Sequence, residues 1–213
     1  MKKQEKKKKL ILNIIEQHIE NNLKQYFIIS ILFIIGVVIG VMVVNNGQIQ
    51  NKEKIGTTIT TFIENMNSEN YQIDYIGLLK NVLTNHVIFA VLLWFLGCSV
   101  IGIPIVYILI GYRGFSLGYT ISSIILVLGV GKGISFSLAT LLLQNLLIIP
   151  AIIAIAVSGT SLYSSIMKNN RMENIKIEII RHTIFCILML AVLAIASIVE
   201  VYISSFLLRI VVK

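Results

Sequence analysis

Five long apolar stretches, separated by short polar segments, occupy about half of the 213 residues of this chain. A helix needs roughly 20 mostly apolar residues to cross a hydrocarbon core about 30 Å thick. A helix also satisfies its own backbone hydrogen bonds, which hydrocarbon cannot do. The pattern therefore predicts an all-α, polytopic membrane bundle with about five transmembrane helices, at 26–44, 87–110, 115–130, 134–157 and 184–208.

The polar segments between these stretches predict helices on the membrane surface. Residues 1–25 begin with six lysines among the first nine positions and continue with apolar residues three or four apart, which is typical of an amphipathic interfacial helix. The segment 45–86 contains two further amphipathic patterns, Ile55–Met66 and Tyr75–Leu83. Asp74 is placed to cap the second of them.

The distribution of Lys and Arg predicts the orientation. With the N-terminus cytoplasmic, the inner segments, which include 158–183 and Arg113 in a short loop, hold twelve Lys and Arg residues, and the outer segments hold six. Cytoplasmic loops carry the excess of positive charge in membrane proteins. The pattern indicates a cytoplasmic N-terminus. The short stretch 115–130 is the point on which this orientation depends, because a re-entrant segment there would invert everything after it.

Composition excludes several functional classes. Hydrophobic residues make up 56% and charged residues 13%, which is far from a soluble domain. The net charge of +8 lies in segments that flank the apolar stretches, which favours a topology signal over nucleic-acid binding. The three histidines stand singly and without zinc-ligand spacing, and the glycine-rich stretch 129–135 lacks two positions of a phosphate-binding loop. We therefore expect no catalytic, cofactor or metal site.

Glu200 is the one acidic residue within the apolar stretches. An ionisable group in hydrocarbon costs about 3 kcal/mol or more and should face a partner inside the bundle. It shares a helix face with Ser197 and Ser204. We interpret it as a neutral, hydrogen-bonding carboxyl that joins helices and that should tolerate Glu200→Gln. The alternative is a proton or cation site.

Two adjacent amides, Gln144 and Asn145, lie at the middle of the fourth stretch, five residues before Pro150. Pro150 frees a backbone carbonyl and predicts a kink. We expect interhelical hydrogen bonds from the amides to Glu200 or to serines of the third stretch. The alternative is a substrate site in a broken helix of a transporter.

Small residues spaced four apart mark two helix faces, Gly36 with Gly40, and Gly114 with Gly118 and Ser122. Such spacing lets helices approach closely. Internal packing is the main expectation, and association with a second copy of the chain is the alternative. The Gly36/Gly40 face is also the best candidate for docking the single span of a partner.

Several segments resemble the stage II sporulation protein M family. They are Leu143–Ala151 with its Gln-Asn…Pro motif, Ala196–Ile203 with its single Glu, Val43–Asn46, and a glycine-rich turn at Gly111–Gly118. The five-span layout and the basic N-terminus are similar as well.

The resemblance implies a non-enzymatic scaffold in the bacterial cell membrane at the sporulation septum. Such a scaffold would recruit the cell-wall hydrolases known as stage II sporulation proteins P and D to remodel septal peptidoglycan during engulfment. The alternative is a small-molecule or ion transporter subunit that uses Glu200 and the Gln144–Pro150 helix.

Overall fold

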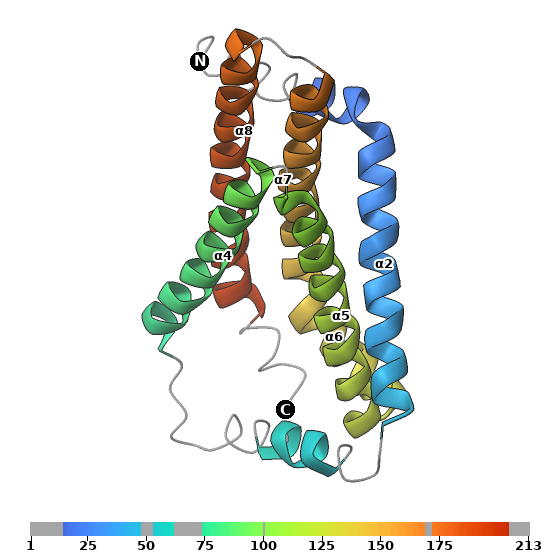
Figure 1. The fold of residues 1–213 in the computed structure, drawn as a ribbon. Helices are drawn as coiled ribbons and strands as arrows, with labels where there is room; N and C mark the ends of the chain where they lie inside the picture. Colours follow the sequence, from blue (N-terminus) through green and yellow to red (C-terminus); the bar gives the residue numbers. More distant parts are fainter. Residues whose placement is uncertain (1–14, 48–52, 62–73, 100, 169–171, 205–213) are drawn as a thin grey trace.

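The computed structural model describes residues 15–47, 53–61, 74–99, 101–168 and 172–204, and almost all of them are helical (Figure 1). The long helices are α2 (Leu23–Asn45), α4 (Tyr75–Gly97), α5 (Gly102–Leu128), α7 (Leu143–Lys168) and α8 (Met172–Val199). Shorter elements are α6 (Val130–Ser137) and the π-helical segments η1 (Leu138–Leu142) and η2 (Glu200–Ser204). Residues 15–21 and 53–61 are helical as well. The all-α fold expected from the sequence is confirmed.

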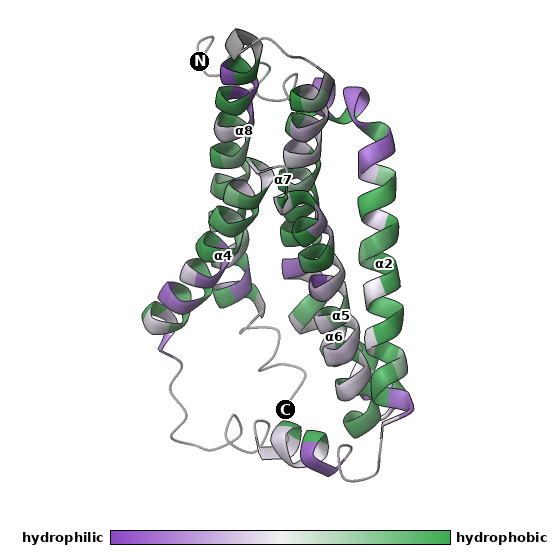
Figure 2. Cartoon of the chain, viewed as in Figure 1, coloured by the Kyte–Doolittle hydropathy of each residue, from purple (hydrophilic) through white to green (hydrophobic). Residues whose placement is uncertain are grey.

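Four helical stretches are long and apolar enough to cross a membrane: Leu23–Asn45, Tyr75–Gly97, Gln144–Met167 and Ile175–Ile203. Figure 2 shows apolar residues along most of their length. The sequence predicted about five spans. The fifth long helix, α5, has 27 residues, about 40 Å of rise, but Arg113 and four glycines lower its mean hydropathy. It lies beside α2 and runs in the same direction (Figure 1).

The core of the bundle lies around α7. Every residue from Ala151 to Thr160 is buried, and Ile148 and Ile155 are fully enclosed by the surrounding helices. Because other apolar helices or lipid surround α7 on all sides, the apolar stretch 134–157 needs no polar face.

Helix α4 packs on α8 along its whole length, in the opposite direction. Tyr75, the first residue of α4, stacks on Tyr202 of η2, which continues α8, with ring centroids 5.5 Å apart. At the opposite end, Trp94 Nε1 donates a hydrogen bond of 3.1 Å to Thr183 Oγ1. These contacts hold α4 to the bundle although its lipid-facing side is exposed.

The break between the second and third long helices is not where the sequence predicted it. The expected turn at Gly111–Gly118 is absent, because α5 continues as a regular helix from Gly102 to Leu128. The chain turns at Cys98–Ile101 instead, so the predicted spans 87–110 and 115–130 are replaced by α4 and α5. A Cβ at Gly102 would overlap the carbonyl group of Leu96, so the tight turn requires glycine there. Pro104 lies in the first turn of α5, where its missing N–H has no helical partner to lose.

The second predicted surface helix is the first part of α4. Asp74 caps it as expected, and its side chain accepts a hydrogen bond of 3.0 Å from the Gly77 amide. Helix 53–61 covers the first part of the predicted Ile55–Met66 helix, and Phe62, Ile63 and Met66 lie outside the described residues.

The N-terminal helix, expected to lie on the membrane surface, contacts the bundle. The His18 ring stacks on Phe185 of α8 with centroids 4.0 Å apart, and His18 Nδ1 lies 3.1 Å from the Tyr26 hydroxyl. Burial, with a smaller contribution from His182, lowers the pKa of His18 to about 4. His18 is therefore neutral near pH 7, and its ring packs without the cost of burying a charge.

Candidate functional site

The glycine faces of α2 and α5 pack against each other. A Cβ at Gly36 would overlap the carbonyl oxygen of Gly111, and one at Gly40 would overlap that of Phe115. In the reverse direction, Cβ atoms at Gly114 and Gly118 would overlap the carbonyls of the residues facing them on α2. The two backbones are therefore in direct contact, as small residues permit in membranes.

The four glycines lie in this internal contact, and Ser122 is buried one turn beyond Gly118. Because α5 covers the Gly36/Gly40 face, that face is not open to the span of a partner or of a second copy of the chain in this fold.

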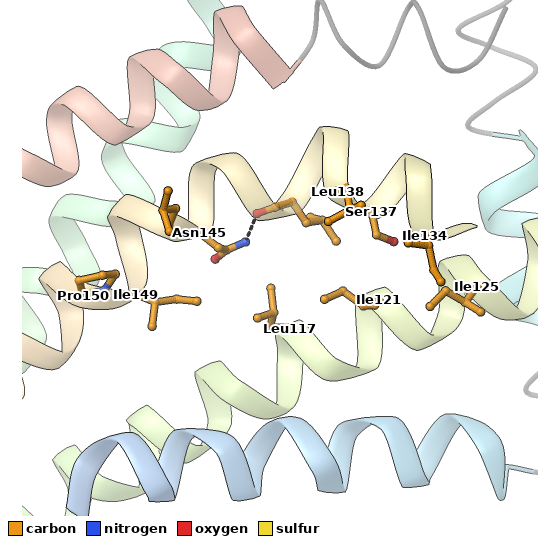
Figure 3. Close-up of a pocket in the computed structure, with 11 residues that line it drawn as sticks. Leu117, Ile121, Ile125, Ile134, Ser137, Leu138, Asn145, Ile149 and Pro150 are labelled. Carbon is orange, nitrogen blue, oxygen red and sulfur yellow. Dashed lines mark hydrogen bonds between the residues drawn. The ribbon is translucent and has the colours of Figure 1, made fainter. Parts of the chain in front are cut away.

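The amide pair lies where a π-helical segment meets a regular helix. Asn145 is buried, and its Nδ2 donates a hydrogen bond of 2.7 Å to the carbonyl of Leu141 in the preceding turn (Figure 3). This bond is within one helical rod, whereas we had expected an interhelical one. The helix continues through Pro150, and the regular hydrogen bonding changes at η1 instead. Such π-helical insertions are frequent at functional sites.

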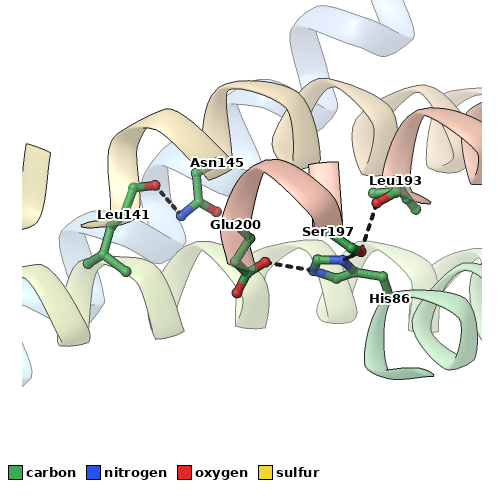
Figure 4. Close-up of polar contacts among 6 residues, drawn as sticks. All are labelled: His86, Leu141, Asn145, Leu193, Ser197 and Glu200. Carbon is green, nitrogen blue, oxygen red and sulfur yellow. Dashed lines mark hydrogen bonds and ion pairs between the residues drawn. The ribbon is translucent and has the colours of Figure 1, made fainter. Parts of the chain in front are cut away.

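Glu200 is the first residue of η2, and it faces α4. Its Oε2 lies 3.7 Å from His86 Nε2, and the two side chains are 24% and 8% exposed (Figure 4). In the sequence, His86 stands alone just before the predicted span 87–110. The structure places it eleven residues inside α4, in the buried interface with α8.

A serine fixes the orientation of the His86 ring. Ser197 Oγ donates a hydrogen bond of 2.9 Å to the Leu193 carbonyl, and its only hydrogen is used there. The 2.9 Å contact between Ser197 Oγ and His86 Nδ1 therefore requires Nδ1–H to donate. Nε2 then faces Glu200 as an acceptor when the ring is neutral. One added proton makes the pair either imidazole with carboxylic acid or imidazolium with carboxylate.

Arg113 completes this site from a third helix. Its guanidinium interacts electrostatically with Glu200 and with His86. We had counted Arg113 in an inner loop, which is wrong because α5 is continuous and Arg113 lies about 17 Å along it. We call His86, Arg113, Ser197 and Glu200 the polar cluster.

The polar cluster gives Glu200 neighbours on two other helices. A guanidinium stays protonated in proteins, so a carboxylate at Glu200 would compensate its charge. A neutral carboxyl, as expected from the sequence, would instead donate a hydrogen bond to the His86 Nε2 that faces it. The sequence held one signal for this partner: Arg113, like Lys132, has a long apolar stretch on each side.

Metal chemistry finds no support in the part of the chain that the structure describes. No three His, Cys, Asp or Glu side chains come together there in a way that could hold an ion. The polar cluster is thus a group of side chains that can exchange a proton and compensate charge across three helices.

Residues 29–205 match the family described as Stage II sporulation protein M. The match includes most of α2, all of the other long helices and the whole polar cluster. No curated protein and no solved structure was found to be similar.

Proposed function

Because this chain belongs to the stage II sporulation protein M family and so has a role in sporulation, we propose that it is a membrane scaffold for engulfment. In this proposal the protein has no catalytic step of its own. It holds the septal peptidoglycan-remodelling enzymes, stage II sporulation proteins P and D, at the membrane between the two cells. The family match over residues 29–205 is the observation that carries the proposal.

The architecture supports a role in holding other proteins. Helix 53–61 and the start of α4 lie at the end of the bundle where α2 also ends (Figure 1). Ile76, in the first turn of α4, is 80% exposed. With the N-terminus in the cytoplasm, this end faces the cell wall and offers apolar side chains to a partner.

The corrected helix boundaries still support that orientation. Moving Arg113 from a loop into α5 leaves eleven Lys and Arg residues on the inner side against six on the outer side. The turn between α4 and α5 lies at the inner end of the bundle. It takes the place of the predicted inner loop that contained Arg113.

Cysteine labelling tests the orientation. In a Cys98→Ala/Cys186→Ala background, Thr57→Cys should react with a membrane-impermeant maleimide on intact cells, because the exposed helix 53–61 faces outward. Lys176→Cys, exposed near the start of α8, should react only after lysis. The reverse pattern would place helix 53–61 in the cytoplasm and remove the wall-facing argument.

Deletion of the gene tests the scaffold. We expect a fluorescently tagged wall hydrolase to lose its septal foci at least tenfold in the deletion strain, because nothing else would hold it there. Wild-type protein should restore the foci, and so should the matched variant Ile39→Leu, whose site on α2 faces lipid. Normal foci in the deletion strain would show that this protein does not place the enzyme.

The polar cluster favours a second candidate function, a transporter subunit. A substrate path needs polar groups from several helices, and His86, Arg113 and Glu200 come from three elements. The Glu200 variants described in the Discussion separate this candidate from the scaffold.

A further inference from the structure

A groove runs between α5 and the continuous rod formed by α6, η1 and α7. Its volume is about 470 Å³, and nine of the eleven side chains that line it are apolar (Figure 3). Leu117 and Ile121 line one wall and Leu138 and Ile149 line the other. The rim faces lipid, because Leu138 is 50% and Leu146 is 65% exposed.

The groove follows the helix axis through about one leaflet. Leu117 and Ile125 on α5 are separated by about 12 Å of helix rise, and half of the hydrocarbon core is about 15 Å. The end formed by Ile125 and Ile134 lies near the start of α6, which is the outer membrane surface in the proposed orientation.

Two polar features distinguish the groove from an ordinary lipid-facing surface. The Ser137 hydroxyl is buried, lines the groove, and has no hydrogen-bond partner among the described residues. An unpaired hydroxyl in hydrocarbon is costly, so a ligand acceptor would satisfy it. Lys132 is exposed in the first turn of α6, two residues before Ile134 and about 8 Å of helix rise from Ser137.

We propose that this groove binds one acyl chain of an anionic phospholipid. The chain lies against Leu117, Ile121 and Leu138, the ester carbonyl accepts a hydrogen bond from Ser137, and the phosphate lies beside Lys132. The order of cation, hydroxyl and apolar wall along the groove matches the order of phosphate, ester and chain in a phospholipid.

An acyl chain fits this groove better than a transmembrane helix does. A helix with its side chains is about 10–12 Å wide and would have to lie partly outside a groove of about 470 Å³. A single hydrocarbon chain is narrow enough to lie in it.

Native mass spectrometry of the full-length protein in detergent tests the proposal. After incubation with phosphatidylglycerol, wild-type protein should retain one lipid molecule, and with phosphatidylcholine it should retain at least fivefold less. Ile121→Trp fills the groove and should lower retention of phosphatidylglycerol at least tenfold. Ile108→Trp adds the same side chain to a 69% exposed position of α5 and should leave retention unchanged.

Two further variants separate the parts of the site. Ser137→Ala should lower retention of both lipids by a similar factor of two to five. Lys132→Gln should lower retention of phosphatidylglycerol alone and so remove the preference between the lipids. Equal retention by wild type and Ile121→Trp, at equal thermal stability, would overturn the proposal. So would photo-crosslinking from a benzoylphenylalanine at Leu138 that captures another protein and no lipid.

Discussion

Replacing Gly36 and Gly40 together by leucine should prevent the bundle from folding. Each new side chain would enter space that the α5 backbone fills at Gly111 and Phe115, and backbone cannot move aside as a side chain can. Overpacking a well-packed core typically costs 1–3 kcal/mol per site. We expect the double variant to lose at least about 3 kcal/mol in SDS titration of the purified protein and to accumulate poorly in cells.

Two alanine variants of α5 provide a matched control. A Cβ at Gly114 would overlap the Phe33 carbonyl, whereas a Cβ at Gly111 meets only the end of the Leu32 side chain at 3.4 Å. Gly114→Ala should therefore destabilise the protein, and Gly111→Ala should be neutral or slightly stabilising, because alanine favours the helix. Equal effects of the two changes would contradict the backbone contact between α2 and α5.

Glu200→Gln should destabilise the protein, because it removes the carboxyl that faces His86 Nε2 and interacts electrostatically with Arg113. The sequence alone had predicted a nearly silent change. Arg113→Gln should cost a similar amount, since it leaves Glu200 with His86 alone. The double variant should cost clearly less than the sum of the two, and SDS titration of all four proteins measures the difference. Strictly additive effects would mean that the two charges do not compensate each other.

The same double variant distinguishes the two candidate functions. If the polar cluster only holds helices together, Glu200→Gln/Arg113→Gln should restore both protein level and spore formation toward wild type. If spore formation is still lost at a normal protein level, the cluster performs a step that needs its charges, as a proton-coupled carrier would.

Local features of the sequence were sufficient to predict the apolar helices and the Asp74 cap, because hydropathy and capping depend on neighbouring residues. The sequence placed the turn between α4 and α5 at the wrong glycines, because glycine is typical both of turns and of close helix contacts. The glycines of α5 are recognised as contact points only once α2 packs on them, with Gly36 opposite Gly111. The need of Glu200 for a partner was predictable from its depth. The partners themselves, His86 and Arg113, depend on how α4 and α5 pack against η2, which no local pattern contains.

The contact between α2 and α5 constrains the order of events during synthesis. Gly36 leaves the ribosome long before Gly111, so α2 must wait in the bilayer with its glycine face open while α4 is made. Helix α5 then enters with Arg113, and Glu200 is translated only after α7 and most of α8. Until then the arginine lacks the carboxyl with which it interacts in the finished bundle, so the polar cluster can form only after the last helix has been made.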